Sequence, residues 1–423
     1  MGIWIQKYKK IVKSLVEANI DIIECGFLTN KVSYNTEITK FTTVDEVATV
    51  IPKDRDGKLF VAMINYGEYR IDDIPDYDGK SIDGIRVAFH KKDLDDALEM
   101  CKLIKKKGYK IFIQPMVSLN YLDDEFLSLI YKVNKIQPYA FYIVDSFGTM
   151  KKKNLIHLFY MIEHNLDEQI WIGFHSHNNM QMAYSNAQSL VEAQTTRNLI
   201  IDSSIHGMGR GAGNLNTELF VEYLNDNTSA NYEMKPLLNI IDEILSDFYQ
   251  KNYWGYSLPN YLSATYSAHP NYAGYFADKN TLTVEAMDEI FSIMDREKRL
   301  EFDNDYAEKM YVQYMETGRT QTENKNEFKD LIKDKTVLLI APGKNCENEK
   351  EKIVDFAMKE DVIAMSVNFD YPYADVDFIF LSNLRRFREL SEDKRGKCIV
   401  TSNIPADNVY LQTKYRNLLC DIE

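Results

Sequence analysis

Short apolar runs alternate with helix-period segments over the first half of the chain, and this alternation restricts the possible folds more than any other feature. Seven strand–helix pairs can be counted, with expected strands that begin near residues 21, 59, 85, 110, 140, 171 and 199. The apolar runs are continuous, which is typical of parallel strands that helices cover on both faces. The sequence therefore predicts an α/β fold on one parallel sheet.

The residues at the carboxyl ends of these strands distinguish a closed barrel from an open sheet. Nearly every expected strand ends in a side chain able to bind a ligand: Glu24, Asn65, His90, Gln114, Asp145, His175 with His177, and His206. In an open doubly wound sheet, binding residues gather at one crossover point, whereas in a (β/α)₈ barrel they come from all the strand ends and meet at one mouth. A TIM barrel is therefore predicted, although the chain opens on a helix over residues 3–18 with no strand before it.

The segment from Gly173 to Asn179 carries the most specific chemistry. An apolar strand runs directly into His175 and His177, which are separated by one residue. Side chains alternate between the faces of a strand, so both imidazoles project from one side and can reach one divalent cation. The alternative is that two polar residues simply end a strand. A glycine-rich loop over residues 207–214 follows one helix later and favours the metal site.

Composition restricts the partners and the compartment. The 423 residues carry a net charge of −14, which disfavours nucleic acid or an anionic membrane as the main partner. Five scattered cysteines without a CxxC spacing fit a reducing cytoplasm and predict neither disulfides nor a zinc cluster. No apolar run reaches the length of a membrane span. We therefore expect a cytoplasmic protein that acts on small molecules. A homo-oligomer is compatible with this composition.

Two motifs about thirty residues apart, His175-Ser-His-Asn-Asn and Gly207-Met-Gly-Arg-Gly-Ala-Gly-Asn, resemble those of the HMG-CoA lyase-like metal-dependent barrels. That group includes 4-hydroxy-2-oxovalerate (pyruvate) aldolases, HMG-CoA lyase and isopropylmalate synthases. Ile23-Glu-Cys-Gly-Phe and Asp145-Ser-Phe-Gly on two other strands support the resemblance, which covers roughly residues 1–225. The first of these phrases and the glycine-rich loop are most similar to the aldolases.

The resemblance implies a metal site. His175 and His177 match the two histidine ligands of the family, and Asn214 matches an asparagine that some members use as an additional ligand. Such mixed nitrogen and oxygen ligation suits Mn²⁺ or Mg²⁺, with other divalent cations as alternatives. The third family ligand is an aspartate in an Arg-Asp pair on the first strand, which would lie before Met1. We therefore expect that this chain lacks the first strand and that pair, and has little or no aldolase activity.

A missing first strand has a structural consequence as well. The strands expected over residues 21–27 and 199–205 would both expose unpaired backbone edges, which predicts an open and destabilised barrel. The alternative is that another segment of the chain fills the gap.

The resemblance also implies the chemistry. In such enzymes pyruvate chelates the cation through its carboxylate and keto oxygens, and the cation stabilises the enolate as a carbon–carbon bond breaks or forms. This predicts a lyase of the 4-hydroxy-2-oxovalerate aldolase kind, with a 2-oxo acid and an aldehyde as substrates. The alternatives are a synthase that condenses acyl-CoA with a 2-oxo acid, as isopropylmalate synthase does, and a non-catalytic barrel scaffold.

Four further strand residues are candidates for the site, three of them with a structural alternative. Asp145 is a candidate catalytic residue, and the alternative is that it only caps the next helix. Glu24 is a second catalytic candidate, and the alternative is a buried structural carboxylate. Arg86 is expected to bind substrate if it points into the barrel, and the alternative is an arginine that faces solvent. Gln114, at the end of its strand, is expected to bind substrate.

The glycine-rich loop supplies two more candidates. Gly209 and Gly211 are expected to bind a carboxylate or phosphate of the substrate through backbone N–H groups. The alternative is that the glycines only make the loop tight.

The chain is expected to hold three parts: the barrel over residues 1–226, a helical extension over 227–328, and a Rossmann-like α/β domain over 329–423. In the aldolases a comparable helical region contributes a tyrosine to the proton chemistry, and Tyr256 is the candidate here, with plain core packing as its alternative. In the third part, the strand Thr336–Ile340 runs into a turn that contains Gly343, which is typical of the start of a Rossmann-like sheet. Few strands are expected before Glu423, which predicts a domain that is cut short.

Overall fold

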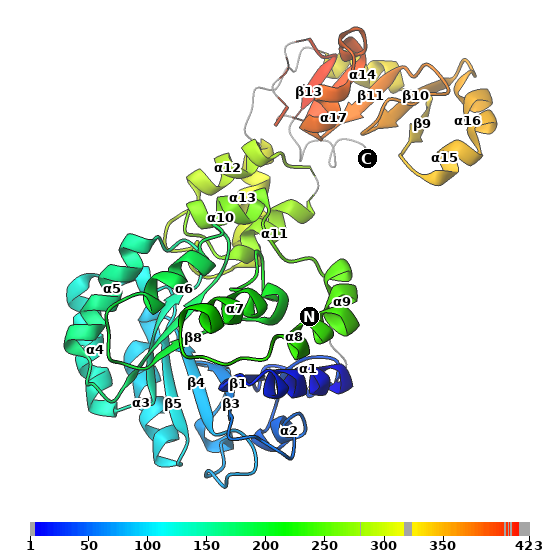
Figure 1. The fold of residues 1–423 in the computed structure, drawn as a ribbon. Helices are drawn as coiled ribbons and strands as arrows, with labels where there is room; N and C mark the ends of the chain where they lie inside the picture. Colours follow the sequence, from blue (N-terminus) through cyan, green and yellow to red (C-terminus); the bar gives the residue numbers. More distant parts are fainter. Residues whose placement is uncertain are drawn as a thin grey trace. The chain divides into compact units, whose positions relative to one another are not determined.

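The computed structural model describes residues 5–279, 281–316, 324–401, 403–404, 406 and 408–413. The chain divides into two compact units, Met1–Thr265 and Tyr266–Glu423, and each is considered by itself (Figure 1). The expected division into three parts remains a prediction. None of the helices in the described ranges combines the length and the apolar character that a membrane span requires.

An eight-stranded parallel sheet forms the centre of the first unit, in the order β2-β1-β3-β4-β5-β6-β7-β8. Its strands are β1 (Ile22–Leu28), β2 (Lys40–Phe41), β3 (Leu59–Asn65), β4 (Gly84–Phe89), β5 (Lys110–Pro115), β6 (Ala140–Asp145), β7 (Trp171–Ser176) and β8 (Leu199–Ile201). The middle strands are buried on both faces, as their continuous apolar runs predict. The sheet is curled, and the predicted α/β barrel class is confirmed.

Helices before, between and after the strands cover the outer face of this sheet (Figure 1). They are α1 (Ile5–Glu17), α2 (Val44–Ala48), α3 (Leu94–Lys106), α4 (Asp123–Ile136), α5 (Lys152–Asn165), α6 (Ala183–Val191) and α7 (Thr217–Asn227). Helix α4 illustrates their packing, because Phe126, Leu129, Ile130 and Val133 recur at helical spacing and all four are fully buried. Each such side chain contributes about 2 kcal/mol of burial energy relative to exposure.

Shorter helical segments complete the first unit. After α7 come α8 (Met234–Ile240), the π-helix η5 (Ile241–Leu245), α9 (Ser246–Lys251) and α10 (Leu258–Thr265). The 3₁₀ turns are η1 (Ile71–Asp73), η2 (Lys91–Asp93), η3 (Ser118–Asn120) and η4 (Ile205–Gly207).

The outer edge of β1 is paired, because β2 lies along it. Phe27 pairs with Lys40 and Leu28 with Phe41, and the N–H of Phe27 donates to the carbonyl of Thr39 at 3.0 Å. The expectation that β1 exposes an unpaired edge is therefore wrong, and the alternative, in which another segment lies there, is correct for this strand. No signal in the sequence marks a strand of two residues.

Gly26 makes this pairing possible. Its φ is +116°, and a Cβ atom at this position would overlap the carbonyl oxygen of Thr39. We expect Gly26→Ala to lower the free energy of unfolding of the first unit by roughly 2–4 kcal/mol, since backbone strain and overpacking add. Urea unfolding followed by tryptophan fluorescence measures this, because Trp171 and Trp254 lie in the first unit.

Gly57 supplies the control for this prediction. It also has a positive φ, of +70°, but a Cβ there meets nothing within 4 Å. Gly57→Ala should therefore cost only the conformational term, roughly 1–2 kcal/mol. If both substitutions have the same effect, the contact between β1 and β2 does not depend on Gly26.

The second unit contains its own parallel sheet of five strands, in the order β13-β12-β11-β10-β9. The strands are β9 (Thr336–Ile340), β10 (Val362–Val367), β11 (Phe378–Leu381), β12 (Cys398–Thr401) and β13 (Leu411–Thr413). The helices are α11 (Pro270–Asp278), α12 (Val284–Ile293), α13 (Asn304–Glu316), α14 (Lys325–Ile332), α15 (Lys344–Asn348), α16 (Lys350–Ala357) and α17 (Leu384–Glu389), with the 3₁₀ turn η6 (Glu392–Lys397). The second α/β sheet that the sequence predicts is present, and β9 has the limits that the sequence predicts.

Candidate active site

The two motifs of the sequence meet at the carboxyl end of β7. The strand ends at Ser176, and the next residue, His177, forms a backbone bridge with Asn214 of the glycine-rich loop. The imidazole rings of His175 and His177 lie 5.3 Å apart between centroids, with their planes at 75°. The structure thus brings all three residues predicted as metal ligands into one place.

The Asn214 amide is held in one orientation. Its Nδ2 donates to the carbonyl of Met208 at 3.0 Å, so Oδ1 points away from Met208. Oδ1 is buried, and within the described part of the chain no donor reaches it. A buried acceptor without a donor is costly, so this oxygen is suited to a ligand that carries positive charge.

His175, His177 and Asn214 present nitrogen and oxygen atoms that suit a divalent cation. Among the described residues, no cluster of three or more histidine, cysteine, aspartate or glutamate side chains is arranged to hold a metal ion. The available set is two imidazoles and the unsatisfied oxygen of Asn214. Neutral imidazole and amide oxygen are ordinary ligands of divalent cations, so the residues fit such an ion and leave coordination positions open.

Arg86 lies at the centre of the interior. Its side chain is only 8% exposed, so the alternative of an arginine that faces solvent is wrong. Nη1 donates to Oε2 of Glu24 at 2.7 Å, and Nη2 donates to Oδ2 of Asp202. With the Gln114 amide turned so that its oxygen faces the guanidinium, that oxygen accepts from Nε at 2.9 Å. Burial lowers the pKa of Arg86, but Asp202 and Glu24 raise it on balance, so the group stays charged.

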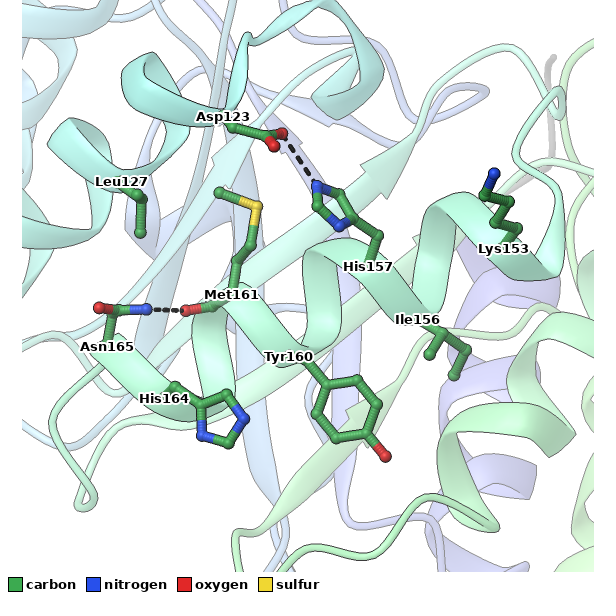
Figure 2. Close-up of a pocket in the computed structure, with 9 residues that line it drawn as sticks. All are labelled: Asp123, Leu127, Lys153, Ile156, His157, Tyr160, Met161, His164 and Asn165. Carbon is green, nitrogen blue, oxygen red and sulfur yellow. Dashed lines mark hydrogen bonds and ion pairs between the residues drawn. The ribbon is translucent and has the colours of Figure 1, made fainter.

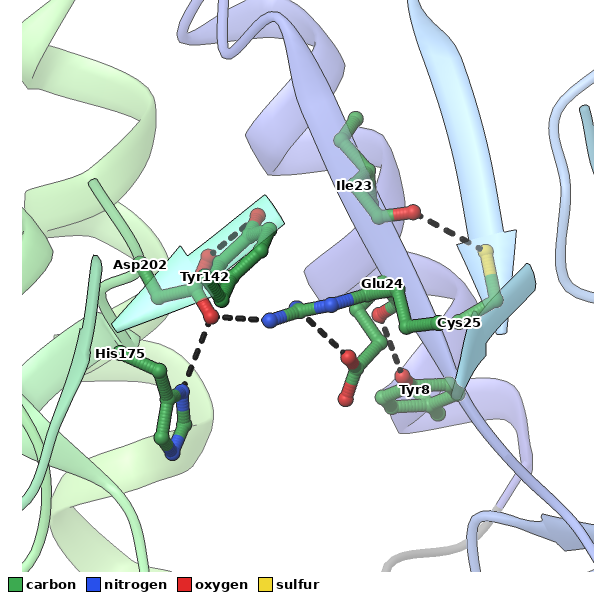
Figure 3. Close-up of polar contacts among 8 residues, drawn as sticks. Tyr8, Ile23, Glu24, Cys25, Tyr142, His175 and Asp202 are labelled. Atoms are coloured by element: carbon green, nitrogen blue, oxygen red, sulfur yellow. Dashed lines mark hydrogen bonds and ion pairs between the residues drawn. The ribbon is translucent and has the colours of Figure 1, made fainter. Parts of the chain in front are cut away.

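Asp202, one residue beyond β8, is a site residue that the sequence did not single out. Its Oδ2 accepts from Nδ1 of His175 at 2.9 Å as well as from Arg86, and its Oδ1 accepts from the hydroxyl of Tyr142 at 3.2 Å (Figure 3). Burial raises the pKa of Asp202, yet Arg86 and His175 outweigh it and lower this pKa overall. Asp202 could have been identified as a carboxylate at the end of a strand. It was not, because the strand was expected to extend to residue 205, which places Asp202 inside it.

Glu24 on β1 is the other partner of Arg86. Burial raises the pKa of this carboxyl, and the positive charge of Arg86 opposes the rise. The ion pair corresponds to the structural alternative for Glu24, and a catalytic role remains a prediction.

Asp145 closes the turn that follows β6. One carboxylate oxygen accepts from the N–H of Thr149 at 2.9 Å and the other from that of Met150 at 3.0 Å. Burial raises the pKa of Asp145 to about 6, against the effect of these two N–H groups. These hydrogen bonds hold the turn before α5, whose N-cap is Lys151, so Asp145 does not cap the helix itself. A pKa near neutrality suits a group that transfers protons, and a catalytic role remains a prediction.

The glycine-rich loop is tight. A Cβ at Gly209 would overlap the side-chain amide of Asn214. Gly209 therefore leaves room for Asn214, the residue predicted to ligate the metal. Gly211 has a φ of +60°, and its carbonyl accepts from the N–H of Gly255 at 3.1 Å. These contacts agree with the alternative of a tight loop, and binding of substrate by either glycine remains a prediction.

The segment that carries Tyr256 reaches this loop through a tryptophan. Nε1 of Trp254 donates to the carbonyl of His206 at 2.9 Å, and the Trp254 side chain is buried. Tyr256 itself is 49% exposed, and its carbonyl accepts from the hydroxyl of Tyr253. The aromatic segment therefore packs on the site, and a catalytic role for Tyr256 remains a prediction.

A depression of about 580 Å³ lies on the outer layer of the unit, between α4 and α5 (Figure 2). All its lining residues belong to these two helices, and none is a strand-end residue of the site. The pair that His157 and Asp123 form across it, 2.9 Å between Nε2 and Oδ1, is largely exposed. Such surface pairs contribute little to stability. The depression shares no lining residue with the candidate site and is separate from it.

A comparison with protein families matches residues 85–243 to the HMGL-like family. This part of the chain, which is less than half of it, is similar to that family. The matched range contains both histidines, Asp202 and Asn214, whereas Glu24 and Tyr256 lie outside it.

Curated proteins to which this chain is similar include aldolases. The 4-hydroxy-2-oxovalerate aldolase from Geobacillus stearothermophilus is 25% identical over 254 residues, which cover 57% of this chain and 70% of that enzyme. The enzyme of the same name from Pseudoalteromonas translucida is 24% identical over 239 residues, or 56% and 68% of the two chains.

A solved structure agrees with the fold. The N-terminal domain of a candidate aldolase from Bacteroides vulgatus is 25% identical and superposes with a TM-score of 0.53, covering 64% of this chain and 89% of that one. The predicted resemblance, the TIM-barrel class and the assignment to the lyases are thereby confirmed.

Proposed function

We propose that this chain is a divalent-metal-dependent carbon–carbon lyase that cleaves a 4-hydroxy-2-oxo acid to pyruvate and an aldehyde, or joins them in reverse. One observation carries the proposal: His175, His177 and the unsatisfied oxygen of Asn214 lie together at the carboxyl end of the sheet. The aldolases among the relatives supply the reaction class.

In this proposal His175, His177 and Asn214 would hold the cation, which is Mn²⁺ or Mg²⁺ because the donors are nitrogen and oxygen. When bound, the cation supplies positive charge that stabilises the enolate of the 2-oxo acid. The rest of the reaction is proton transfer. The 4-hydroxyl loses its proton as the bond between carbons 3 and 4 breaks, and carbon 3 later gains one to give pyruvate.

The buried residues have separate parts in this scheme. Asp145, with a pKa of about 6, is the proposed carrier of the proton, since a group near neutrality both accepts and donates it. Tyr256 is kept as the second candidate for that step. Arg86 has both Nη atoms on carboxylates and its Nε on Gln114, so we propose that it positions other residues and does not touch substrate.

The experiment is an assay of the purified full chain. We expect it to bind Mn²⁺ and to release pyruvate from 4-hydroxy-2-oxovalerate only slowly, in keeping with the low aldolase activity expected from the sequence. The release is measured with a coupled lactate dehydrogenase, and we expect a chelator to abolish it. Bound metal without pyruvate release would favour a non-catalytic scaffold. Consumption of acyl-CoA in the presence of a 2-oxo acid would favour the condensing synthase.

A further inference from the structure

Asp202 occupies a place in the site that the proposed chemistry does not yet use. Its carboxylate has three neighbours that donate hydrogen bonds: Arg86, the hydroxyl of Tyr142, and Nδ1 of His175 (Figure 3). The Asp202 side chain is 12% exposed, so water takes little part in satisfying it. A carboxylate held from three sides can fix the orientation of the His175 imidazole.

The hydrogen bond decides the tautomer of His175. An ionised carboxylate only accepts hydrogen bonds, so the proton between Asp202 and His175 must belong to Nδ1. A neutral imidazole has one N–H and one bare nitrogen, which leaves the lone pair on Nε2. Figure 3 shows that this second nitrogen points away from Asp202. Histidines that ligate metals commonly donate their other N–H to a carboxylate in this way.

Arg86 and Tyr142 hold Asp202 in turn. Arg86 extends from β4 and also binds Glu24 on β1. The Asp202 carboxylate is therefore linked to β4 and, through Arg86, to β1. Tyr142 comes from β6 and pairs in register with Gly173 of β7, where a larger side chain would overlap the tyrosine ring. The position of Asp202 is therefore fixed by rigid strands and not by a loop alone.

We propose that Asp202 is a positioning residue that locks His175 in the Nδ1–H tautomer and presents Nε2 to a divalent cation, with Arg86 and Tyr142 holding the carboxylate in place. The inference rests on the proposed metal site. In this proposal the Asp202 carboxylate orients the metal ligand His175. The series of contacts from Glu24 through Arg86 and Asp202 to His175 supports the site.

The first test uses the protein without metal. In the full chain labelled with ¹⁵N-histidine, the His175 side chain, identified by its loss in His175→Ala, should show a protonated Nδ1 and a bare Nε2 at pH 8. Asp202→Asn should shift this pattern toward the other tautomer or toward a mixture, because an amide can also donate. Asp202→Glu, which keeps the carboxylate, should restore it at least in part.

The second test measures Mn²⁺ affinity by calorimetry. Asp202→Asn should weaken binding by about 10–100-fold, the usual effect of removing a partner that orients a ligand. A loss as large as that in His177→Ala would make Asp202 a direct ligand and overturn the positioning role. An unchanged affinity together with an unchanged tautomer would also overturn it.

Asp83 provides a matched control. It is equally buried, 12% exposed, and pairs with Arg55, but it lies at the opposite end of the sheet, just before β4. Asp83→Asn should destabilise the unit without altering the His175 signal or the Mn²⁺ affinity, and an equal effect of both variants would contradict the proposal. If the wild type does not bind Mn²⁺, the proposed function fails, and the tautomer measurement alone then decides whether Asp202 orients His175.

Discussion

Replacing His177 by alanine should reduce the affinity for Mn²⁺ by more than 100-fold and abolish any release of pyruvate from 4-hydroxy-2-oxovalerate. The substitution removes one of only two imidazoles at the site, and its loss should exceed the 10–100-fold effect of a partner that merely orients a ligand. His177 follows the last residue of β7, so the free energy of unfolding should change by no more than about 1 kcal/mol. Calorimetry and urea unfolding measure the two quantities separately.

His157→Ala is the control for this experiment. His157 lies on α5, its side chain is 53% exposed, and its partner Asp123 is exposed as well. Loss of such a pair costs at most about 1 kcal/mol and should leave Mn²⁺ binding unchanged. If His177→Ala retains the metal content and affinity of the wild type, the ligand assignment is wrong.

The fold could be predicted because each strand is bounded by clear signals. The limits of β3 and β10 agree with their apolar runs, since polar residues stand at both ends of each run. The two-residue strand β2 could not be predicted, because its pairing depends on the contact with β1 and on Gly26. Strand β8 ends at Ile201 and not at residue 205, where the sequence placed its end.

The site was predictable where its residues belong to recognisable motifs and unpredictable where they do not. The pattern His-x-His and the final asparagine of the loop identify three residues that the structure brings together. Asp202 and Arg86 are 116 residues apart, and nothing local shows that they form an ion pair. Glu24 and Arg86 were predicted singly as catalytic and substrate-binding residues, whereas their pairing appears only in the folded chain.

Replacing Arg86 by methionine should lower the free energy of unfolding of the first unit by roughly 3–5 kcal/mol at pH 7, because it leaves the carboxylates of Glu24 and Asp202 buried without a cation. Tryptophan fluorescence in urea follows this unit, since Trp171 and Trp254 belong to it. Arg70→Met is the control: Arg70 is exposed and its partners are distant, so the expected change is under about 1 kcal/mol.

The pH dependence gives a second, independent measure of the same ion pairs. In the wild type the pKa of Asp202 is lowered, so its contribution to stability is present above the ordinary carboxyl pKa and is lost as the pH falls. Without Arg86, burial should raise the pKa of both carboxyls above their unfolded values, so the folded variant binds more protons than the unfolded chain. Stability of Arg86→Met should therefore rise as the pH falls from 7 to 5, and its difference from the wild type should shrink. A difference that stays constant over this range would show that Arg86 stabilises the unit by packing and not by its charge.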